Sequence, residues 1–578
     1  MSKEQNFIVF INKLTDSLKK NKSVYKINSI INEQLLISNF FNNIDEVYQF
    51  SSQKESFYSY DQSGRDFGDF QTPYSLTNHI CEFLFNLGFN PDIVIEPTCG
   101  EGNFVISALK YFPALKKIIA IDIQPSYEHA FKKKILISQL NNKKNSEIHF
   151  IKGNIFKIDL EELLKRKNIR KSDQIIALGN PPWLTNAELS KLNSDNIPVK
   201  KNLTALKGLD AITGKANFDI SENIIFNLIK SLPENTIFAF LLKYTVIRNL
   251  IRNMDKYNVS LQDCKAFLID TSKEFKVNIS AGLFIFKKGP SEVKTCNVYS
   301  FYRPDKLLYE FGIIRKKFVS NIELYDKVGF IEGISPFVWR QGIKHDATKL
   351  LVLDETHPKT YVNGLNKKVD IEEDLIYPLV KSSHLNQLMI KSTSKKLIVT
   401  QSNIGQNTNY IKEYFPKSWL YLIGVESLFE LRKSIIYKNK PKFSIFGVGD
   451  YSFKRYKIAV SGFNKKINFT YIPPIDNKPV MLDDTCYFLS FDHQTDALIV
   501  WGLLNSKIVF NYLSSIVFLD NKRPYTKDIL MRMDIKILLN NISFENFLDT
   551  YSSLNSKFDI KKITKEDYIE FTELLLKN

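Results

Sequence analysis

Short apolar runs alternate with helix-forming segments between residues 64 and 290, and this alternation constrains the fold more strongly than composition does. Buried strands joined by helices form mostly parallel sheets that are covered by helices on both faces. Ligands in such sheets bind beyond the carboxyl ends of the strands. The sequence therefore predicts an α/β, Rossmann-like domain with its site at that edge. The expected strands are 92–96, 118–122, 149–152, 175–178, 236–242 and 281–286.

The first of these strands ends at Glu96 and Pro97 and leads into a turn with two glycines, Gly100 and Gly102. Glycines let the backbone approach a ligand where the next helix begins. Asp122 ends the following strand, roughly twenty residues later, where a carboxylate can accept hydrogen bonds from both hydroxyls of a ribose. A tight structural turn would also explain the glycines. We interpret the pattern as a nucleotide-cofactor loop.

The type of cofactor follows from what accompanies the two glycines. The third glycine of a dinucleotide fingerprint is missing, and so is a cluster of donors for a pyrophosphate. A nucleoside cofactor without phosphate fits better, which points to S-adenosylmethionine. One strand further on, the Asn154 amide could bond the adenine edge of this cofactor while Ile155 contacts its face. A simple Gly-Asn turn is the alternative for that pair.

The strand at 175–178 stops abruptly in a stiff loop. It is followed by Gly179, Asn180, Pro181, Pro182 and Trp183. Two consecutive prolines fix the backbone and donate no ladder hydrogen bonds. The loop therefore places one amide and one aromatic ring at the end of a strand.

This loop suits the chemistry of an exocyclic base amine, whose lone pair is delocalised into the ring. The side-chain oxygen of Asn180 and the carbonyl of Pro181 can both accept from the amine and localise its lone pair. Attack on a sulfonium methyl group then needs positioning and electrostatics, without a metal or a covalent enzyme intermediate. Trp183 offers a flat surface for a base taken out of the helix stack. A tight loop with a core tryptophan is the alternative interpretation.

Taken together, these segments resemble the motif series of the amino-group DNA methyltransferases. The motif order, with cofactor motifs first and a long C-terminal region last, resembles the gamma group of N6-adenine methyltransferases of type II restriction–modification systems. The resemblance is specific over 64–290 and looser over 330–530, where Ser335–Asp346 resembles the target-recognition region. The matching segments are Gln71-Thr72-Pro73, Glu96-Pro97-x-x-Gly100-x-Gly102-x-Phe104, Asp122, Gly153-Asn154-Ile155 and Asn180-Pro181-Pro182-Trp183.

The resemblance implies a class I S-adenosylmethionine-dependent methyltransferase domain and a role for each matching cofactor residue. Thr72 would contact the methionine end, and Glu96 with the backbone of Gly100–Gly102 would line the pocket. Asp122 would bind the ribose. Asn154 would bind the adenine amine, at a position where many members have Asp.

The resemblance also implies a catalytic set. Asn180 and Pro181 would accept from the target amine, and Trp183 would stack on the base where many members have Tyr or Phe. A second aromatic residue should close the other face of the base, and Phe275 fits best, with a core phenylalanine as the alternative. Ala216–Ile220 resembles a family segment to which the sequence assigns no role.

Basic and aromatic residues mark the C-terminal region, above all over Lys438–Lys466, where Gly447 and Gly449 suggest a tight turn. Basic side chains can hold phosphates while rings and amides meet base edges. A basic solvated hairpin is the alternative. The predicted DNA contacts are Arg340, Lys344, Lys442, Lys454, Arg455, Lys457 and Arg523.

The chain is too long for one ordinary core, which predicts several domains. We expect a helical N-terminal extension over 1–62, the methyltransferase domain over 63–300, and a separate mixed α+β DNA target-recognition domain over 301–578. The extension is expected to be amphipathic and to pack on the domain that follows.

Charge and cysteine usage bear on partners and location. The 79 Lys and Arg exceed the 62 Asp and Glu, which gives a net charge of +17 and favours a polyanionic partner such as double-stranded DNA. A lysine-rich proteome would give the same excess. Five scattered cysteines fit a reducing cytoplasm and argue against a zinc site. We expect no membrane segment, a monomer or weak dimer, and a cognate restriction endonuclease that acts separately.

Three rival functions remain from the sequence. A fused restriction–modification enzyme would need a nuclease domain, for which 62 residues before the methyltransferase unit are few. Methylation of an amine or amide in RNA or protein uses similar motifs, although the long C-terminal region favours duplex DNA. A catalytically inactive DNA-binding protein would not need the intact loop at 180–183. A cytosine-N4 target also remains open, because the amine chemistry is alike.

Overall fold

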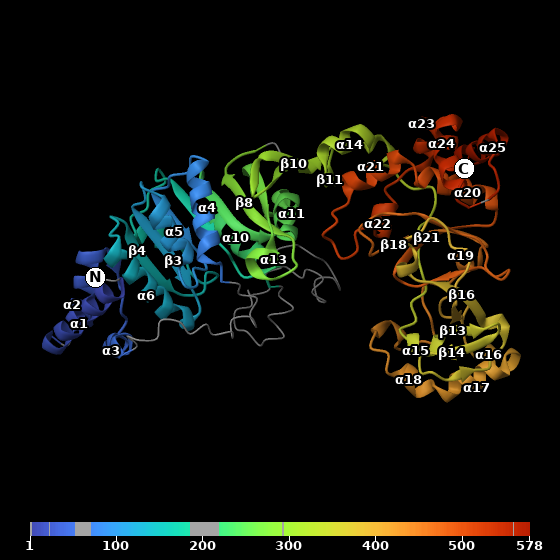
Figure 1. Cartoon of the computed structure of the whole chain (residues 1–578), viewed down its shortest axis with the longest axis horizontal. Coiled ribbons are helices and arrows are strands. Elements are labelled where there is room, and N and C mark those ends of the chain that lie inside the picture. The colour runs from blue at the N-terminus through green and yellow to red at the C-terminus, as the bar shows by residue number, and fades with distance from the viewer. Residues whose placement is uncertain are drawn as a thin grey trace. The chain divides into compact units, whose positions relative to one another are not determined.

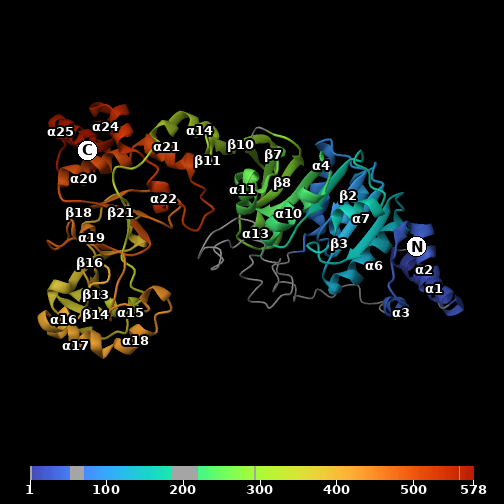
Figure 2. The same cartoon turned by 180° about the vertical axis from the view of Figure 1, so that it is seen from behind.

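The computed structural model of the chain describes residues 3–21, 23–52, 71–184, 219–291, 294–558 and 560–577. It forms two compact units, Met1–Phe318 and Val319–Asn578 (Figures 1 and 2). Two of the segments singled out in the sequence lie outside the described residues. They are the residues just before Gln71, and Ala216–Phe218.

The first unit is built on an 11-stranded sheet. From one edge to the other the strands are β1 (Ile37–Ser38), β4 (Glu147–Lys152), β3 (Lys117–Asp122), β2 (Ile93–Glu96), β5 (Ile175–Gly179), β6 (Ile237–Lys243), β8 (Ala281–Lys288), β7 (Leu261–Ile269), β9 (Thr295–Ser300), β10 (Arg303–Ile314) and β11 (Lys317–Val319). The strands from β1 to β6 are parallel, and β8 is antiparallel to both of its neighbours. This arrangement confirms the predicted Rossmann-like α/β fold of a class I methyltransferase domain.

The register of the central strands brings the predicted site residues to one edge. Ile95 of β2 pairs with Ile119 of β3 and with Ala177 of β5. The carboxyl ends of these three parallel strands therefore align, and the turns that follow them are neighbours.

Helices cover both faces of this sheet (Figures 1 and 2). The helices α5 and α6 lead the chain from β2 to β3 and on to β4, towards one edge of the sheet. The helices α7 and α10 lead it back from β4 to β5 and on to β6, in the opposite direction. Because such crossovers are right-handed, the two pairs of helices lie on opposite faces. The helices of the unit are α1 (Lys3–Asn21), α2 (Val24–Leu35), α3 (Ile44–Ser52), α4 (Tyr74–Asn86), α5 (Asn103–Tyr111), α6 (Pro125–Asn141), α7 (Leu160–Arg166), α10 (Ile220–Ser231), α11 (Tyr244–Arg252), α12 (Met254–Tyr257) and α13 (Thr271–Phe275).

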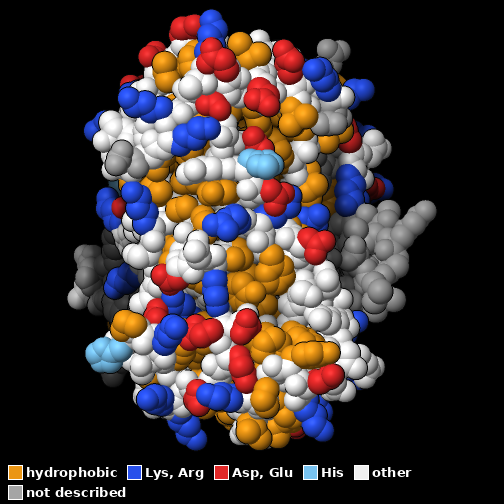
Figure 3. Space-filling model, turned by 90° about the vertical axis from the view of Figure 1, so that its right-hand side faces the viewer, with side chains coloured by type: hydrophobic (Ala, Val, Ile, Leu, Met, Phe, Trp, Pro, Cys, Tyr) orange, Lys and Arg blue, Asp and Glu red, His pale blue; other side chains and the backbone are white. Residues whose placement is uncertain are grey.

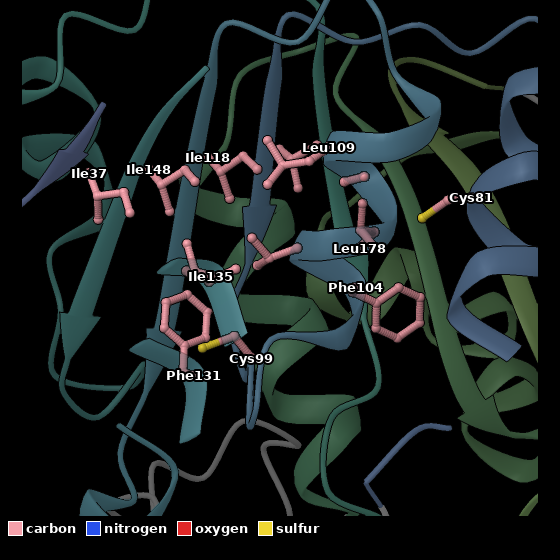
Figure 4. Packing of buried hydrophobic residues seen from close by; sticks show 14 of the residues in the cluster. Ile37, Cys81, Cys99, Phe104, Leu109, Ile118, Phe131, Ile135, Ile148 and Leu178 are labelled. Carbon is pink, nitrogen blue, oxygen red and sulfur yellow. The ribbon is translucent and has the colours of Figure 1, made fainter. Parts of the chain in front are cut away.

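One continuous apolar core lies between the sheet and the helices α4, α5 and α6. Figure 4 shows Ile148 and Ile118 of adjacent strands facing this core, with Leu109 of α5 beside them. Phe131 of α6 lies close to Cys99 in the same view. The core thus extends to the turn after β2, where Cys99 is one of its members.

The N-terminal segment forms the helices α1, α2 and α3, and it also adds the edge strand β1 to the sheet through parallel pairing with β4. A two-residue strand carries no usable sequence signal, so β1 was not predicted. Lys132 of α6 is almost fully buried and forms ion pairs with Glu46 of α3 and with Glu128. These contacts fix the extension on α6.

The first unit ends at Phe318, later than the boundary expected at residue 300. The reason is that β9, β10 and β11 continue the same sheet beyond β7. The second unit therefore begins at Val319.

The second unit contains two smaller sheets, which agrees with the predicted mixed α+β character. The four-stranded sheet has the order β12 (Arg340–Gln341), β21 (Cys486–Phe491), β18 (Tyr456–Ser461) and β19 (Thr470–Ile472). The six-stranded sheet has the order β15 (Lys368–Val369), β14 (Thr360–Asn363), β13 (Val352–His357), β17 (Lys395–Ile398), β16 (Ile376–Val380) and β20 (Met481–Leu482).

Helices flank these sheets and form the end of the chain. They are α14 (Ile322–Val328), α15 (Thr348–Leu351), α16 (Tyr410–Tyr414), α17 (Pro416–Gly424), α18 (Glu426–Glu430), α19 (Asp450–Phe453), α20 (Gln494–Leu504), α21 (Lys507–Ile516), α22 (Lys527–Leu530), α23 (Ile535–Asn541), α24 (Phe544–Asn555) and α25 (Lys565–Lys577). Within the described ranges, no single helix has the length and apolarity to cross a membrane. The bent pair α20 and α21 meets that test together, and most of α20 is buried inside the unit.

Candidate active site

The turn after β2 is tied to the end of β3 through Asp122. One carboxylate oxygen of Asp122 accepts from the backbone N–H of Gly100 at 2.8 Å, and the other accepts from the N–H of Gln124 at 2.8 Å. A carboxylate has about four acceptor positions, so these two backbone bonds do not by themselves saturate Asp122. The residue predicted to bind ribose therefore also holds the glycine turn in place.

Both glycines of this turn adopt positive φ angles, +50° at Gly100 and +82° at Gly102, which favour glycine. A Cβ atom at Gly100 would lie 2.6 Å from Oε1 of Gln71, and one at Gly102 would lie 2.6 Å from the ring of Phe131. Gln71 and Phe131 thus close on the turn from two sides. Sequence reasoning assigned neither residue this role, because the contacts join segments far apart in the chain.

Thr72 is held at the start of α5. Its carbonyl accepts from the side-chain amide of Asn103 at 2.8 Å, and its side chain is buried. The segment before α4 is therefore adjacent to the glycine turn, as the prediction of a shared cofactor pocket requires.

Glu96 is a buried acid at the carboxyl end of β2. Burial raises its pKa well above the usual value, and the nearby Asp122 raises it further. Among the described residues, Oε2 of Glu96 has no hydrogen-bond partner. An unsatisfied buried oxygen is costly, which favours a bound ligand group at this position.

Asn154 closes the turn after β4. Its side-chain oxygen accepts from the N–H of Phe156 at 2.9 Å, and the N–H of Gly153 donates to the carbonyl of Asp122 at 2.8 Å. The side chain of Ile155 is buried. The structure thus brings Asn154 beside Asp122 and also gives its oxygen the turn-forming role that the sequence left open.

The stiff loop after β5 begins next to the end of β2 and the glycine turn that follows it. Gly179 has a φ of +152°, and a Cβ atom there would lie 3.5 Å from Cγ of Glu96 and 3.8 Å from Pro97. Asn180 follows directly, with its side-chain oxygen shielded from solvent. The predicted catalytic amide and the predicted cofactor residues are therefore immediate neighbours.

Trp183 packs into the core at the other end of this loop. Its side chain is 3% exposed, and its indole N–H donates to the carbonyl of Leu241 in β6 at 3.4 Å. The ring of Phe275, at the end of α13, lies 5.4 Å from the Trp183 ring between centroids. The two aromatic residues singled out in the sequence therefore meet, although Trp183 also fulfils the alternative of a core residue.

A largely buried ion pair holds the chain that returns to this loop. Asp219 caps α10 by accepting from the N–H of Ser221, and its other oxygen accepts from Nζ of Lys243 at 2.8 Å. The N–H of Ile220 donates to the carbonyl of Leu184, next to Trp183, at 2.8 Å. Asp219 lies in the segment that had no assigned role, and Lys243 was not predicted.

In the second unit, the structure brings together the two segments predicted to recognise DNA. Lys344 and Phe446 exchange backbone hydrogen bonds of 2.8 and 2.9 Å. Gly447 has a φ of +73°, and a Cβ atom there would lie 2.4 Å from the carbonyl of Gly342. The expected tight turn is therefore the point where the two segments touch.

Six of the seven predicted DNA-binding side chains reach solvent. Arg340, Lys442 and Arg455 are exposed, and the others are half-buried: Lys344, Lys454 and Arg523. Lys344, Lys442 and Lys454 pair with carboxylates, namely those of Asp346, Glu426 and Asp492. In the view of Figure 3, Lys and Arg are interspersed with acidic and apolar side chains rather than gathered in one patch.

Lys457 does not fit the predicted role. Its side chain is 1% exposed, its ammonium donates to the carbonyl of Lys454 at 2.8 Å, and burial lowers its pKa to about 7. The side chain points into the unit because β18 is buried along most of its length. Lys457 therefore cannot contact a DNA phosphate in this conformation.

Comparison with known proteins identifies one closely similar relative. The type II methyltransferase M.NspV of Nostoc sp. is 39% identical over 476 residues, which covers 82% of this chain and 97% of the relative. No family model matches the chain.

Two solved structures match the chain at low identity. The type IIL restriction-modification enzyme MmeI in complex with DNA is 12% identical, with a TM-score of 0.48 over 96% of this chain and 74% of that one. The type IIG restriction endonuclease BpuSI is 13% identical, with a TM-score of 0.35 over 92% of this chain and 69% of that one.

Proposed function

Because the chain belongs to the type II methyltransferases, we propose that it methylates N6 of adenine at specific sites in duplex DNA, with S-adenosylmethionine as the methyl donor. Its place would be in a restriction–modification system, beside a separate endonuclease, and its motif order would put it in the gamma group. The observation that carries the proposal is the proximity of Gly179 to Glu96 and Pro97, which a Cβ atom at Gly179 would touch, so that the Asn180 amide lies near the predicted cofactor turn.

The residues at the ends of β2, β3 and β4 fit S-adenosylmethionine. The buried Oε2 of Glu96 needs a partner that the described residues do not supply, and a polar ligand group supplies one. The Asp122 carboxylate lies at the end of β3, where it would accept from the ribose hydroxyls, and the positive φ angles of the two glycines shape the turn beside it. When bound, the cofactor supplies an electrophilic methyl group on its sulfonium.

The protein's contribution to the reaction is to position the target amine. Asn180 and Pro181 accept the two amine hydrogens, so the nitrogen lone pair becomes localised and available for attack. The prolines keep both acceptors in one rigid loop, which lowers the entropic cost of alignment. Trp183 and Phe275 would hold the flipped adenine by stacking. No strong base is needed before the methyl group is transferred, because the proton leaves from the alkylated nitrogen.

The second unit would present the duplex to this site. Arg340 and Arg455 are exposed, and the segments around Lys344 and Phe446 lie side by side in the predicted target-recognition region. Exposed basic residues supply phosphate contacts, which position the protein on DNA.

The proposal is tested by transfer of a tritiated methyl group to plasmid DNA, followed by digestion of the product to nucleosides. We expect the label in 6-methyladenine. Label in 4-methylcytosine would correct the target base, while label only in RNA or protein would overturn the proposal. DNA cleavage by the purified chain would support a fused enzyme instead.

Asn180→Ala separates catalysis from cofactor binding. Transfer should fall below detection, while S-adenosylmethionine still binds by calorimetry, because Asn180 contacts the target amine rather than the cofactor. Asn297→Ala, on β9 outside the site, is the matched control and should retain activity. Transfer that survives in Asn180→Ala would contradict the mechanism, and a wild-type chain that binds DNA without transfer would indicate an inactive binding protein.

A further inference from the structure

A short turn in the second unit exposes two isoleucines at the surface. The 3-10 turn η5 (Ile435–Tyr437) has Ile435 at 84% exposure and Ile436 at 39%. Two adjacent exposed aliphatic side chains offer apolar area whose burial against a partner is favourable. The turn therefore has the character of a contact element.

The base of this turn is firmly held. The guanidinium of Arg432 lies 3.8 Å from the centre of the Tyr437 ring and donates to the carbonyl of Ser444 at 2.7 Å. Tyr437 in turn contacts the ring of Phe446, 5.4 Å between centroids. Because the backbone of this turn is already ordered, inserting one of its side chains into a partner costs little additional conformational entropy.

The turn also belongs to the predicted target-recognition surface. Phe446 exchanges two backbone hydrogen bonds with Lys344, and Arg432 donates to the carbonyl of His345 at 3.4 Å. The isoleucines are therefore connected through two residues to the segment 335–346. Sequence reasoning missed them because it searched this region for basic residues.

The charge around the turn identifies the partner. Lys433, Lys438 and Lys440 are exposed and form no ion pair among the described residues. The chain carries no acidic residue from Leu431 to Gly449. Protein–protein interfaces are depleted in lysine, whereas DNA-binding surfaces combine Lys with apolar side chains that enter the base stack.

We propose that Ile435, supported by Ile436, is an apolar wedge that enters between base pairs of the recognition site while the flanking lysines contact phosphates. This inference rests on the proposed function and names the part of the DNA interface that distorts the duplex at a step other than the methylated adenine. Asn439, exposed beside the turn, is placed to meet a base edge next to that step.

The test uses the full-length chain and duplexes that contain its methylation site, as defined by sequencing of methylated DNA. Each duplex carries 2-aminopurine at one position, and its fluorescence rises where stacking is lost. With wild-type protein we expect one rise at the methylated adenine and a second rise at another step. Ile435→Ala/Ile436→Ala should abolish the second rise, keep the first, and weaken specific binding about tenfold.

Two further variants separate apolar from electrostatic effects. Leu420→Ala, which removes a 73% exposed aliphatic side chain on α17, is the matched control and should leave both rises unchanged. Lys438→Gln/Lys440→Gln should retain the second rise at saturating protein. For this variant, the slope of log Kd against log salt concentration should be smaller in magnitude by about 2, because two phosphate contacts are lost.

The inference is overturned if wild-type protein gives no second rise, or if the rise persists in Ile435→Ala/Ile436→Ala. It is also overturned if the wild-type chain sediments as a dimer that this double substitution dissociates, because the turn would then join two copies. Failure of the proposed function is distinguishable, since it appears as absent methyl transfer to DNA by the wild-type chain.

Discussion

Trp183 and Phe275 contact each other directly, with 5.4 Å between ring centroids and 61° between ring planes. A base stacked between two rings needs about 7 Å between them, twice the van der Waals separation. The two rings must therefore separate when a base enters. Trp183 is anchored by its bond to Leu241, whereas Phe275 is half-buried at the end of a five-residue helix. Phe275 is the ring expected to move.

Phe275→Ala should lower kcat/KM for DNA methylation about tenfold to hundredfold, because stacking on one aromatic face contributes about 1–3 kcal/mol per base. Binding of S-adenosylmethionine should not change. The measurement is steady-state transfer to plasmid DNA, together with cofactor titration. Phe275→Tyr keeps the aromatic face and should retain most activity. Equal activity in Phe275→Ala and wild type would assign this residue to the core alone.

The largely buried ion pair between Asp219 and Lys243 should position the loop at 180–183, the proposed catalytic loop. Asp219→Ala leaves the part-buried ammonium of Lys243 without its partner, which should lower the free energy of unfolding by about 2 kcal/mol. It should also lower kcat, because Ile220 is bonded to Leu184 at the end of the loop. Urea unfolding and steady-state kinetics measure the two effects.

A double-mutant cycle isolates the pair from the helix cap. Asp219→Asn keeps an acceptor for Ser221, and adding Lys243→Met removes the unpaired charge. The double variant should therefore be more stable than Asp219→Ala. Additive losses from the two positions would show that the ion pair contributes nothing to the fold.

The central strands and their site-bearing ends were predictable because their signal is local. The strands β2, β3 and β5 are short apolar runs bounded by Gly, Pro or Asp, and their parallel order follows from the helices between them. Topology then brings Glu96, Asp122 and Asn180 to one edge. No contact beyond the strand order was needed to predict that these residues are neighbours.

The missed features depend on contacts between distant segments. The strand β10 begins with exposed polar residues and has no alternating pattern, so its place in the first sheet follows only from pairing with β9. Gln71 and Phe131 act on the glycine turn from positions about thirty residues away on either side. A lysine inside a basic run, such as Lys457, looks exposed until the burial of its strand is known.

Glu222 of α10 should make stability depend on pH. Burial raises its pKa to about 7, and its Oε2 accepts from the amide of Asn249 at 3.0 Å. Between the unfolded pKa of about 4.3 and about pH 7 the folded state binds more protons than the unfolded state. The free energy of unfolding should therefore fall as pH rises through this window, by about 4 kcal/mol in total.

Glu222→Gln removes the titration and keeps a side chain of the same shape. Its stability should be less dependent on pH between 5 and 8 than that of the wild type, and at pH 8 the variant should be the more stable protein. Urea unfolding at several pH values measures the difference. Parallel pH profiles for the two proteins would assign the dependence to other groups.

Lys457 should influence stability rather than DNA binding. Its pKa is lowered to about 7 by burial, so above pH 7 the folded state holds a neutral amine while the unfolded state still binds a proton. Stability should thus rise with pH from about 7 towards about 10, and Lys457→Met should abolish that rise. The variant should also be more stable than wild type at pH 6, where the wild-type protein buries a charged ammonium.

DNA binding should not depend on Lys457. The slope of log Kd against log salt concentration should be the same in Lys457→Met as in the wild type. Arg455→Gln, which removes an exposed cation two residues away, should reduce the magnitude of that slope by about 1. A shallower salt dependence in Lys457→Met would mean that the strand opens on DNA and exposes this lysine to a phosphate.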